Sequence, residues 1–242
     1  MDFDDLEMKA SDPSTTMMFL CNPHNPVGRA WTRNELQKLG HICARHGVLV
    51  VADEMHGDLV FAGRQYTPFA SLGADYAANC MTCLSPAKSF NIASCCSAFT
   101  VIEEETMRKA FQAENSRLTV NKINAFASVA METAYRHGGP WLDAALSYLK
   151  RNVDVVRDRL SDIPNVDLIE LDGTFLLWLD FRKLGLEPDH LTAFLKGRAK
   201  WAVTRGHAFG PQGAGFARLN IACPRAKLTI AFDRLKSAVS SL

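Results

Sequence analysis

Four short apolar runs mark the first part of the chain and predict buried strands. They cover residues 16–21, 48–52, 79–84 and 95–102, and turn-forming or charged residues follow each of them. Apolar runs of this length are typical of strands in the interior of a sheet. The segments between the first three runs are long enough for helical crossovers, so we expect a mostly parallel sheet flanked by helices.

One of these crossovers has the polar and apolar spacing of a capped helix. Thr32 and Glu35 stand three residues apart, as in a capping box, where each side chain accepts a hydrogen bond from the other residue's backbone N–H. Leu36 and Leu39 follow on one face, and Gly47 ends the segment. We therefore expect a helix that begins after Thr32 and buries one apolar face.

The second part of the chain predicts a long helix followed by smaller elements. Residues 138–140 (Gly-Gly-Pro) break the chain, an amphipathic pattern runs from Leu142 to Leu160, and Pro164 stops it. After that we expect a hairpin of residues 166–171 and 174–181 with Asp172-Gly173 at its turn, strands at 201–204 and 216–222, and helices beginning near Pro188 and Pro224.

Together these elements predict an α/β protein of two parts. Residues 1–140 would form part of a large domain built on the mostly parallel sheet. Residues 141–163 would form the connecting helix, and residues 164–242 a small α+β domain at the C-terminus. Ligands of open α/β sheets bind beyond the carboxyl ends of the strands. The segment 22–28, Asp53 and Lys88 all follow such ends, so we expect them to meet at one rim.

Composition and charge exclude several classes of function. The 242 residues are 48% hydrophobic with a formal net charge of +1, which gives no electrostatic basis for binding nucleic acid or an anionic membrane. The longest apolar runs are far too short to span a bilayer, and the acidic residues 1–8 do not resemble a signal peptide. We expect neither nucleic acid nor a membrane as a partner.

The seven cysteines fit reduced thiols in a cytoplasm better than a disulfide framework. Cys80 and Cys83 form a C-x-x-C, and Cys95 and Cys96 follow, but an adjacent pair suits tetrahedral zinc poorly. We therefore interpret them as structural and expect no metal. The D-E-x-H sequence at residues 53–56 leaves a metal-hydrolase site as an alternative.

Three motifs occur in a fixed order along the chain: NPHNPVG at residues 22–28, DEMHGD at 53–58 and SPAKSFN at 85–91. GPWLD at 139–143, residues 174–180 and FARLN at 216–220 extend the set. This ordered set resembles the class I/II aminotransferase superfamily of pyridoxal-phosphate (PLP) enzymes, fold type I. Within it, the motifs at 53–58 and 88–92 resemble cystathionine β-lyases of the MalY/PatB type.

The resemblance implies a role for each candidate residue toward the cofactor pyridoxal 5'-phosphate. Lys88 would carry the cofactor as a Schiff base and later move protons. Asp53 would pair with the pyridine nitrogen, Asn25 would donate to the ring phenolate oxygen and His56 would lie near that oxygen. Ser85 would help to bind the phosphate. Taken alone, these residues have other interpretations: a surface charge, a helix cap, a turn residue or a packed histidine.

The resemblance also implies a substrate and a reaction. Arg218 would bind the α-carboxylate of an amino acid, although in a strand it could be an edge charge. The implied activity is β-elimination from cystathionine or related cysteine S-conjugates, which gives pyruvate, ammonia and a thiol. An aminotransferase is the alternative. Members of this family are homodimers, so we expect a homodimer. The cysteine content, as noted above, indicates the cytoplasm.

Two departures from the family pattern accompany the resemblance. Many members carry an arginine eight residues after the lysine, where this chain has Cys96. The motifs also belong to the later part of such enzymes, so we expect the sequence to lack the N-terminal part of the family fold, and with it a phosphate-binding loop. A catalytically silent relative or interaction module is therefore a further alternative.

Overall fold

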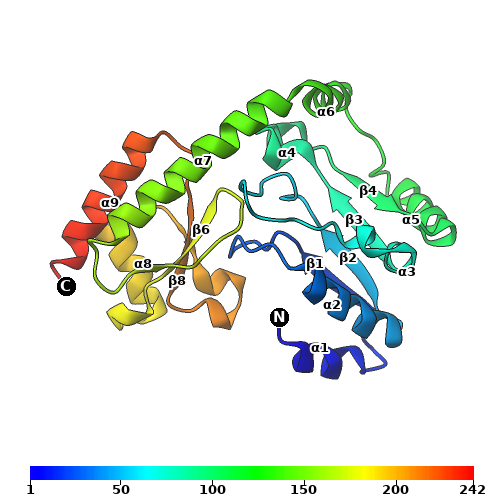
Figure 1. Cartoon of the computed structure of the whole chain (residues 1–242), viewed down its shortest axis with the longest axis horizontal. Coiled ribbons are helices and arrows are strands. Elements are labelled where there is room, and N and C mark those ends of the chain that lie inside the picture. The colour runs from blue at the N-terminus through cyan, green and yellow to red at the C-terminus, as the bar shows by residue number, and fades with distance from the viewer. The chain divides into compact units, whose positions relative to one another are not determined.

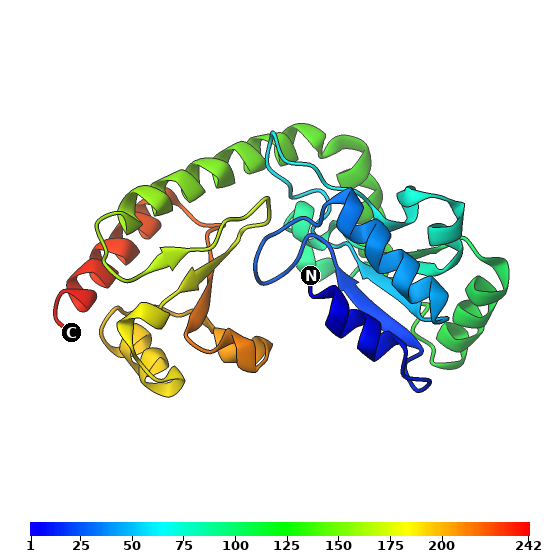
Figure 2. The same cartoon turned by 60° about the horizontal axis from the view of Figure 1, so that its bottom comes forward.

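The computed structural model describes residues 1–242, which form two compact units (Figures 1 and 2). The first unit holds Met1–Pro23 and Ala30–Asp143. The second unit holds His24–Arg29 and Ala144–Leu242. The segment His24–Arg29 therefore belongs to a different unit from the chain on either side of it.

The first unit is built on one four-stranded sheet, with strand order β1-β2-β3-β4. Its strands are β1 (Met17–Cys21), β2 (Leu49–Asp53), β3 (Cys80–Leu84) and β4 (Phe99–Ile102). Its helices are α1 (Phe3–Ala10), α2 (Arg33–Arg45), α3 (Ala74–Ala78), α4 (Pro86–Ser89), α5 (Glu105–Arg117) and α6 (Ala125–His137). The first three strands are parallel and β4 is antiparallel to β3, which confirms the predicted mostly parallel sheet.

Helix α2 follows from its sequence as predicted. The Thr32 hydroxyl accepts a hydrogen bond from the Glu35 backbone N–H at 3.3 Å, and the Glu35 carboxylate accepts one from the Thr32 N–H at 3.0 Å. The apolar face of α2 packs with the strands in a core of Ala10, Leu20, Leu36, Leu39, Ile42, Cys43, Val48, Val50, Ala52, Phe69, Leu72 and Cys80. This burial fixes the sheet whose strand ends carry the candidate site.

The predicted strand at residues 95–102 is shorter than expected. A 3-10 turn occupies Ala93–Cys95, and Cys96 has a left-handed backbone with φ 50°. A strand cannot pass through that conformation, so β4 begins only at Phe99. Helices α1, α4, α5 and α6 were not predicted. Helix α5 buries no residue, and α6 buries only Ala127, so neither packs a wide apolar face into the core.

The second unit combines a small antiparallel sheet with helices, in agreement with the predicted α+β class, but the strand predicted at residues 201–204 forms only at Thr204–Arg205. Its strands are β5 (Asp167–Leu168), β6 (Leu176–Asp180), β7 (Thr204–Arg205) and β8 (Phe216–Asn220), in the order β5-β6-β8-β7. Its helices are α7 (Gly139–Leu160), which begins in the first unit, α8 (Pro188–Gly197) and α9 (Arg225–Val239). As expected, Pro188 occupies the first turn of α8 and Pro224 caps α9.

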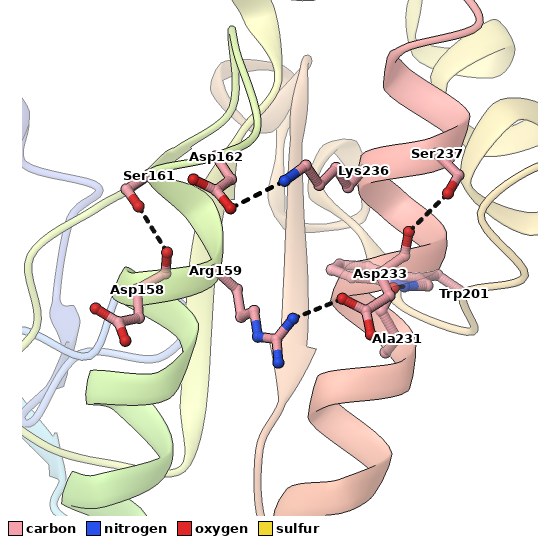
Figure 3. Close-up of polar contacts among 9 residues, drawn as sticks. All are labelled: Asp158, Arg159, Ser161, Asp162, Trp201, Ala231, Asp233, Lys236 and Ser237. Carbon is pink, nitrogen blue, oxygen red and sulfur yellow. Dashed lines mark hydrogen bonds and ion pairs between the residues drawn. The ribbon is translucent and has the colours of Figure 1, made fainter.

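Helices α7 and α9 lie side by side, joined at their surface by two ion pairs (Figure 3). Arg159 contacts Asp233 at 2.6 Å, and Lys236 contacts Asp162 at 2.9 Å. The interior of the unit is apolar: Leu177, Leu179 and Leu235 are completely buried, and Trp201 and Phe232 pack edge to face. Apolar packing therefore holds this unit together, and the ion pairs lie at its margin.

The predicted hairpin is present, but its tight turn is not. Strands β5 and β6 pair antiparallel, with Leu168 opposite Leu179, so residues 169–175 connect them. The backbone N–H groups of Asp172 and Gly173 donate to the Gly28 carbonyl at 2.8 and 3.1 Å. Because these donors serve the His24–Arg29 segment, the two residues are not the centre of a two-residue turn.

None of the helices combines the length and the apolar character that a membrane crossing requires.

Candidate active site

The carboxyl ends of β1, β2 and β3 lie next to one another in the first unit. Cys21 is paired with Asp53, and Asp53 with Cys83, so these three residues form one row across the parallel strands. The segment that contains Lys88 follows directly after β3. Asp53 and Lys88 therefore leave neighbouring strands at the same edge, where open α/β sheets bind their ligands.

Asp53 is half-buried and has no cation beside it within the chain. Its Oδ1 accepts a hydrogen bond from the Met55 backbone N–H at 3.3 Å, and it makes no ion pair. Glu54 lies differently: it is 2% exposed and accepts hydrogen bonds from the Tyr66 hydroxyl at 2.5 Å and the Phe69 N–H at 2.7 Å. Of the two acids, Asp53 is the one accessible to a ligand.

Lys88 lies on the short helix α4, which is anchored on both sides of it. Ser85 caps the helix by accepting from the Ala87 N–H at 3.1 Å, and the Ser89 hydroxyl donates to Asp58 at 2.7 Å. The Lys88 side chain is exposed and makes no hydrogen bond or ion pair within the chain. The structure thus fixes the backbone of Lys88 and leaves its amine available.

Ser85 is buried, and its hydroxyl donates to the Ser97 carbonyl at 2.6 Å. A hydroxyl carries a single proton, so binding a phosphate through it would require the hydroxyl to turn away from Ser97. His56 is also buried, at 7% exposure, in the turn after β2. The roles of both residues toward a cofactor stay predictions.

Asn25 and Arg218 meet in the second unit, although they are far apart in the sequence. Arg218 donates to the Asn25 side-chain oxygen at 2.8 Å and to the Thr204 hydroxyl at 3.3 Å. Because the Asn25 oxygen is an acceptor here, its NH₂ group is the part of the amide that can donate to a ligand. Burial lowers the pKa of Arg218, and no carboxylate pairs with it.

An arginine that is partly buried without a carboxylate partner is suited to bind an acidic ligand. The guanidinium has five N–H donors in one plane. Within the chain it makes two hydrogen bonds, both to neutral oxygen atoms. Sequence reasoning missed Thr204 and also Phe209, whose ring lies 4.8 Å from the Arg218 guanidinium. Only strand register places Thr204 opposite Arg218, and no motif marks it.

The fold and these residues define the class of protein. The sequence profile described as "Aminotransferase class I and II" matches residues 1–235. The chain therefore belongs to the class I and II aminotransferase family, as its motifs indicated.

The chain is also similar to individual members of this family, both in sequence and in structure. The chain is 44% identical to "Cystathionine beta-lyase PatB" of Bacillus subtilis (strain 168) over 241 residues, covering 99% of this chain and 62% of that protein. It superposes with a TM-score of 0.95 on a PLP-bound putative aminotransferase from Clostridium difficile 630, at 39% identity, covering 99% and 62%. Cystalysin from Treponema denticola, whose structure contains PLP, gives a TM-score of 0.97 at 30% identity, covering 100% and 61%.

The chain thus spans about 62% of the length of this curated relative. Within the part that it spans, the donor set fits a pyridine aldehyde such as PLP. Asp53 is a carboxylate without a cation, and Lys88 is an amine without an acid, which are the two groups that a protonated pyridine nitrogen and an aldehyde require. The fit to the phosphate group is weaker, because the Ser85 proton is already used.

Proposed function

We propose that this chain belongs to a PLP-dependent carbon–sulfur β-lyase that acts on cystathionine or related cysteine S-conjugates. The overall reaction takes the amino acid and water to pyruvate, ammonia and a thiol. The observation that carries the proposal is the position of Asp53 and Lys88 after neighbouring strand ends, each without a partner of opposite charge within the chain. The 44% identity to a cystathionine β-lyase supports the choice of reaction.

The proposed residues divide the work between cofactor and substrate. Lys88 would hold the cofactor through its amine and, once released, take the proton from the substrate Cα. Asp53 would keep a proton on the pyridine nitrogen, and Asn25 would donate to the ring oxygen. His56 would lie near that oxygen, and Ser85 would contribute to the phosphate site. When bound, PLP supplies the electron sink that makes the Cα proton removable.

Arg218 would bind the substrate α-carboxylate. It presents N–H groups in the planar arrangement that matches a carboxylate, and it has no internal acid that would compete. The proposal places an amino acid as substrate and assigns no metal to the reaction.

We also propose a division into a large-domain part at residues 1–140, a connecting helix at 141–163 and a small domain at 164–242. All seven cysteines are free thiols, which supports a cytoplasmic location.

A groove of about 840 Å³ with an apolar lining runs along α6 in the first unit. This apolar surface supports association of the protein into a homodimer.

The test is pyruvate release from L-cystathionine by the protein supplied with PLP. We expect turnover by the parent protein, and Asp53→Asn should lower kcat by at least about a hundredfold, because a neutral pyridine nitrogen is a poor electron sink. Asp75→Asn, on the exposed surface of α3, is the matched control and should leave kcat unchanged.

Three results would contradict the proposal. Amino transfer to a 2-oxo acid without pyruvate release would assign the site to an aminotransferase. PLP binding without either reaction would indicate a silent relative. Near-normal turnover by Asp53→Asn would remove the role given to that carboxylate.

A further inference from the structure

One face of the sheet in the second unit carries large aromatic and charged side chains. Trp178 is paired with Arg218, and Asp180 with Phe216, across the β6–β8 ladder, so these four residues share a face. The alternate residues, such as Leu177 and Leu179, lie on the opposite face in the apolar interior. On this face, the strand register therefore places Arg218 next to Trp178.

The end of this face away from Arg218 is held by an ion pair. Arg182 binds the Asp180 carboxylate, with its Nη2 at 2.6 Å from Oδ2, and its guanidinium lies 4.6 Å from the centre of the Phe216 ring. Phe216 in turn stacks on Trp178 at 5.2 Å with 8° between the ring planes. Trp178 is buried, so this arrangement fixes the plane of its indole.

The stack continues from Trp178 to Arg218 through a single ring. Phe209, at the end of the 3-10 turn Gly206–Phe209, meets Trp178 edge to face at 5.6 Å and 86°. The same ring lies 4.8 Å from the guanidinium carbon of Arg218. Phe209 is 40% exposed, so its own burial does not explain its position, whereas its contacts with Trp178 and Arg218 do.

Phe209 adds an aromatic contact to the two hydrogen bonds that hold the Arg218 guanidinium. The bonds to Asn25 and Thr204 act through two N–H groups of the guanidinium, and the Phe209 ring, over which the guanidinium carbon lies, adds a contact that limits movement of the group. A bidentate carboxylate contact requires the plane of the guanidinium to be fixed in advance. We propose that Phe209 is a positioning residue, which orients Arg218 to bind the substrate α-carboxylate; this rests on the role proposed above for Arg218.

The test compares ligands that differ only in the carboxylate. Calorimetry of the PLP-loaded protein would measure binding of L-alanine, which has no leaving group, and of L-alaninamide. Phe209→Leu should weaken L-alanine by about three- to thirtyfold, the range expected for loss of a cation–π contact, and leave L-alaninamide within about twofold. Phe209→Tyr keeps an aromatic face and should retain the parent preference.

A kinetic measurement with cystathionine separates positioning from chemistry. Phe209→Leu should raise KM by a similar factor while kcat stays within about threefold, because the carboxylate contact is formed before and during reaction. Equal affinity of Phe209→Leu and the parent protein for L-alanine would overturn the proposal. A loss of the same size in Phe209→Tyr would overturn it too, since the aromatic face would then be irrelevant.

Two further variants make the result specific. Tyr148 lies 4.7 Å from the Arg225 guanidinium in the same unit, so Tyr148→Leu removes a similar contact elsewhere and should leave the ligand preference unchanged. An equal loss there would overturn the proposal. Arg218→Ala should abolish the preference for L-alanine; if it does not, the carboxylate role itself fails, whereas loss in Arg218→Ala but not in Phe209→Leu defeats only the positioning role.

Discussion

Adjacent acids in the sequence can have opposite tasks, and Asp53 and Glu54 illustrate this. Asp53 is the last residue of β2, and Glu54 is the first residue after it. Asp53 lies at the accessible rim, whereas Glu54 is buried against Tyr66 and Phe69 and ties the following loop to the strand end. The motif shows that both carboxylates are there, but only burial shows which one is accessible to a ligand.

Burial raises the pKa of Glu54 above its ordinary value of 4.5, and the nearby Asp53 charge adds to this shift. The folded protein therefore binds the Glu54 proton more tightly than the unfolded chain does. The stabilisation from this group is complete below about pH 4.5 and is lost as pH rises through the raised pKa. The free energy of unfolding should fall with pH over that window.

Glu54→Gln removes this titration. We expect the free energy of unfolding of the parent protein, measured in urea, to fall relative to that of the variant as pH rises from 4.5. Glu103→Gln, at an exposed position, controls for the change of a carboxylate to an amide. A difference between parent and Glu54→Gln that is constant with pH would contradict this account.

At the scale of elements, the sequence predicted those parts whose local and tertiary signals agree. Helix α2 has both a capping box and a buried apolar face, and it begins where expected. The predicted Asp172-Gly173 turn failed because both N–H groups bind the Gly28 carbonyl, a partner that no local pattern reveals. The partnership of Asn25 with Arg218 is long-range for the same reason, so motifs identified the residues but not their contact.

The packing of α9 on α7 depends on apolar burial more than on ion pairs. Leu235→Ala removes a completely buried side chain and should lower the free energy of unfolding by about 2–5 kcal/mol. Arg159→Ala breaks the contact with Asp233, but the arginine side chain is 41% exposed, so the cost should stay below about 1 kcal/mol. Urea unfolding of both variants measures the contrast, and a larger loss in Arg159→Ala would reverse the assignment.

At the scale of the whole molecule, the first unit exposes several large apolar side chains around α6. Phe126 and Val129 on α6 are 86% and 66% exposed, and Trp141 is 51% exposed beside the same groove. Apolar patches of this kind mark surfaces that associate. This is the surface that we expect to be covered when the protein assembles.

Sedimentation should therefore show association that increases with concentration. Replacing Phe126 and Val129 together by Asp should weaken it at least tenfold, because two charges would enter an apolar contact. Ile230→Asp on α9 places a charge at another exposed apolar position and should have no such effect. A parent protein that stays monomeric at every concentration would exclude this interface.

The central claim is that the amine of Lys88, on the segment that follows the strand next to Asp53, is the group that holds PLP. The most direct measurement is reduction of the PLP-loaded protein with borohydride, which makes the bond between lysine and cofactor permanent, followed by mass spectrometry of its peptides. The account predicts that the peptide containing Lys88 alone carries the pyridoxyl group, and that Lys88→Ala carries none. Labelling of another lysine in the parent protein, or undiminished labelling of Lys88→Ala, would contradict it.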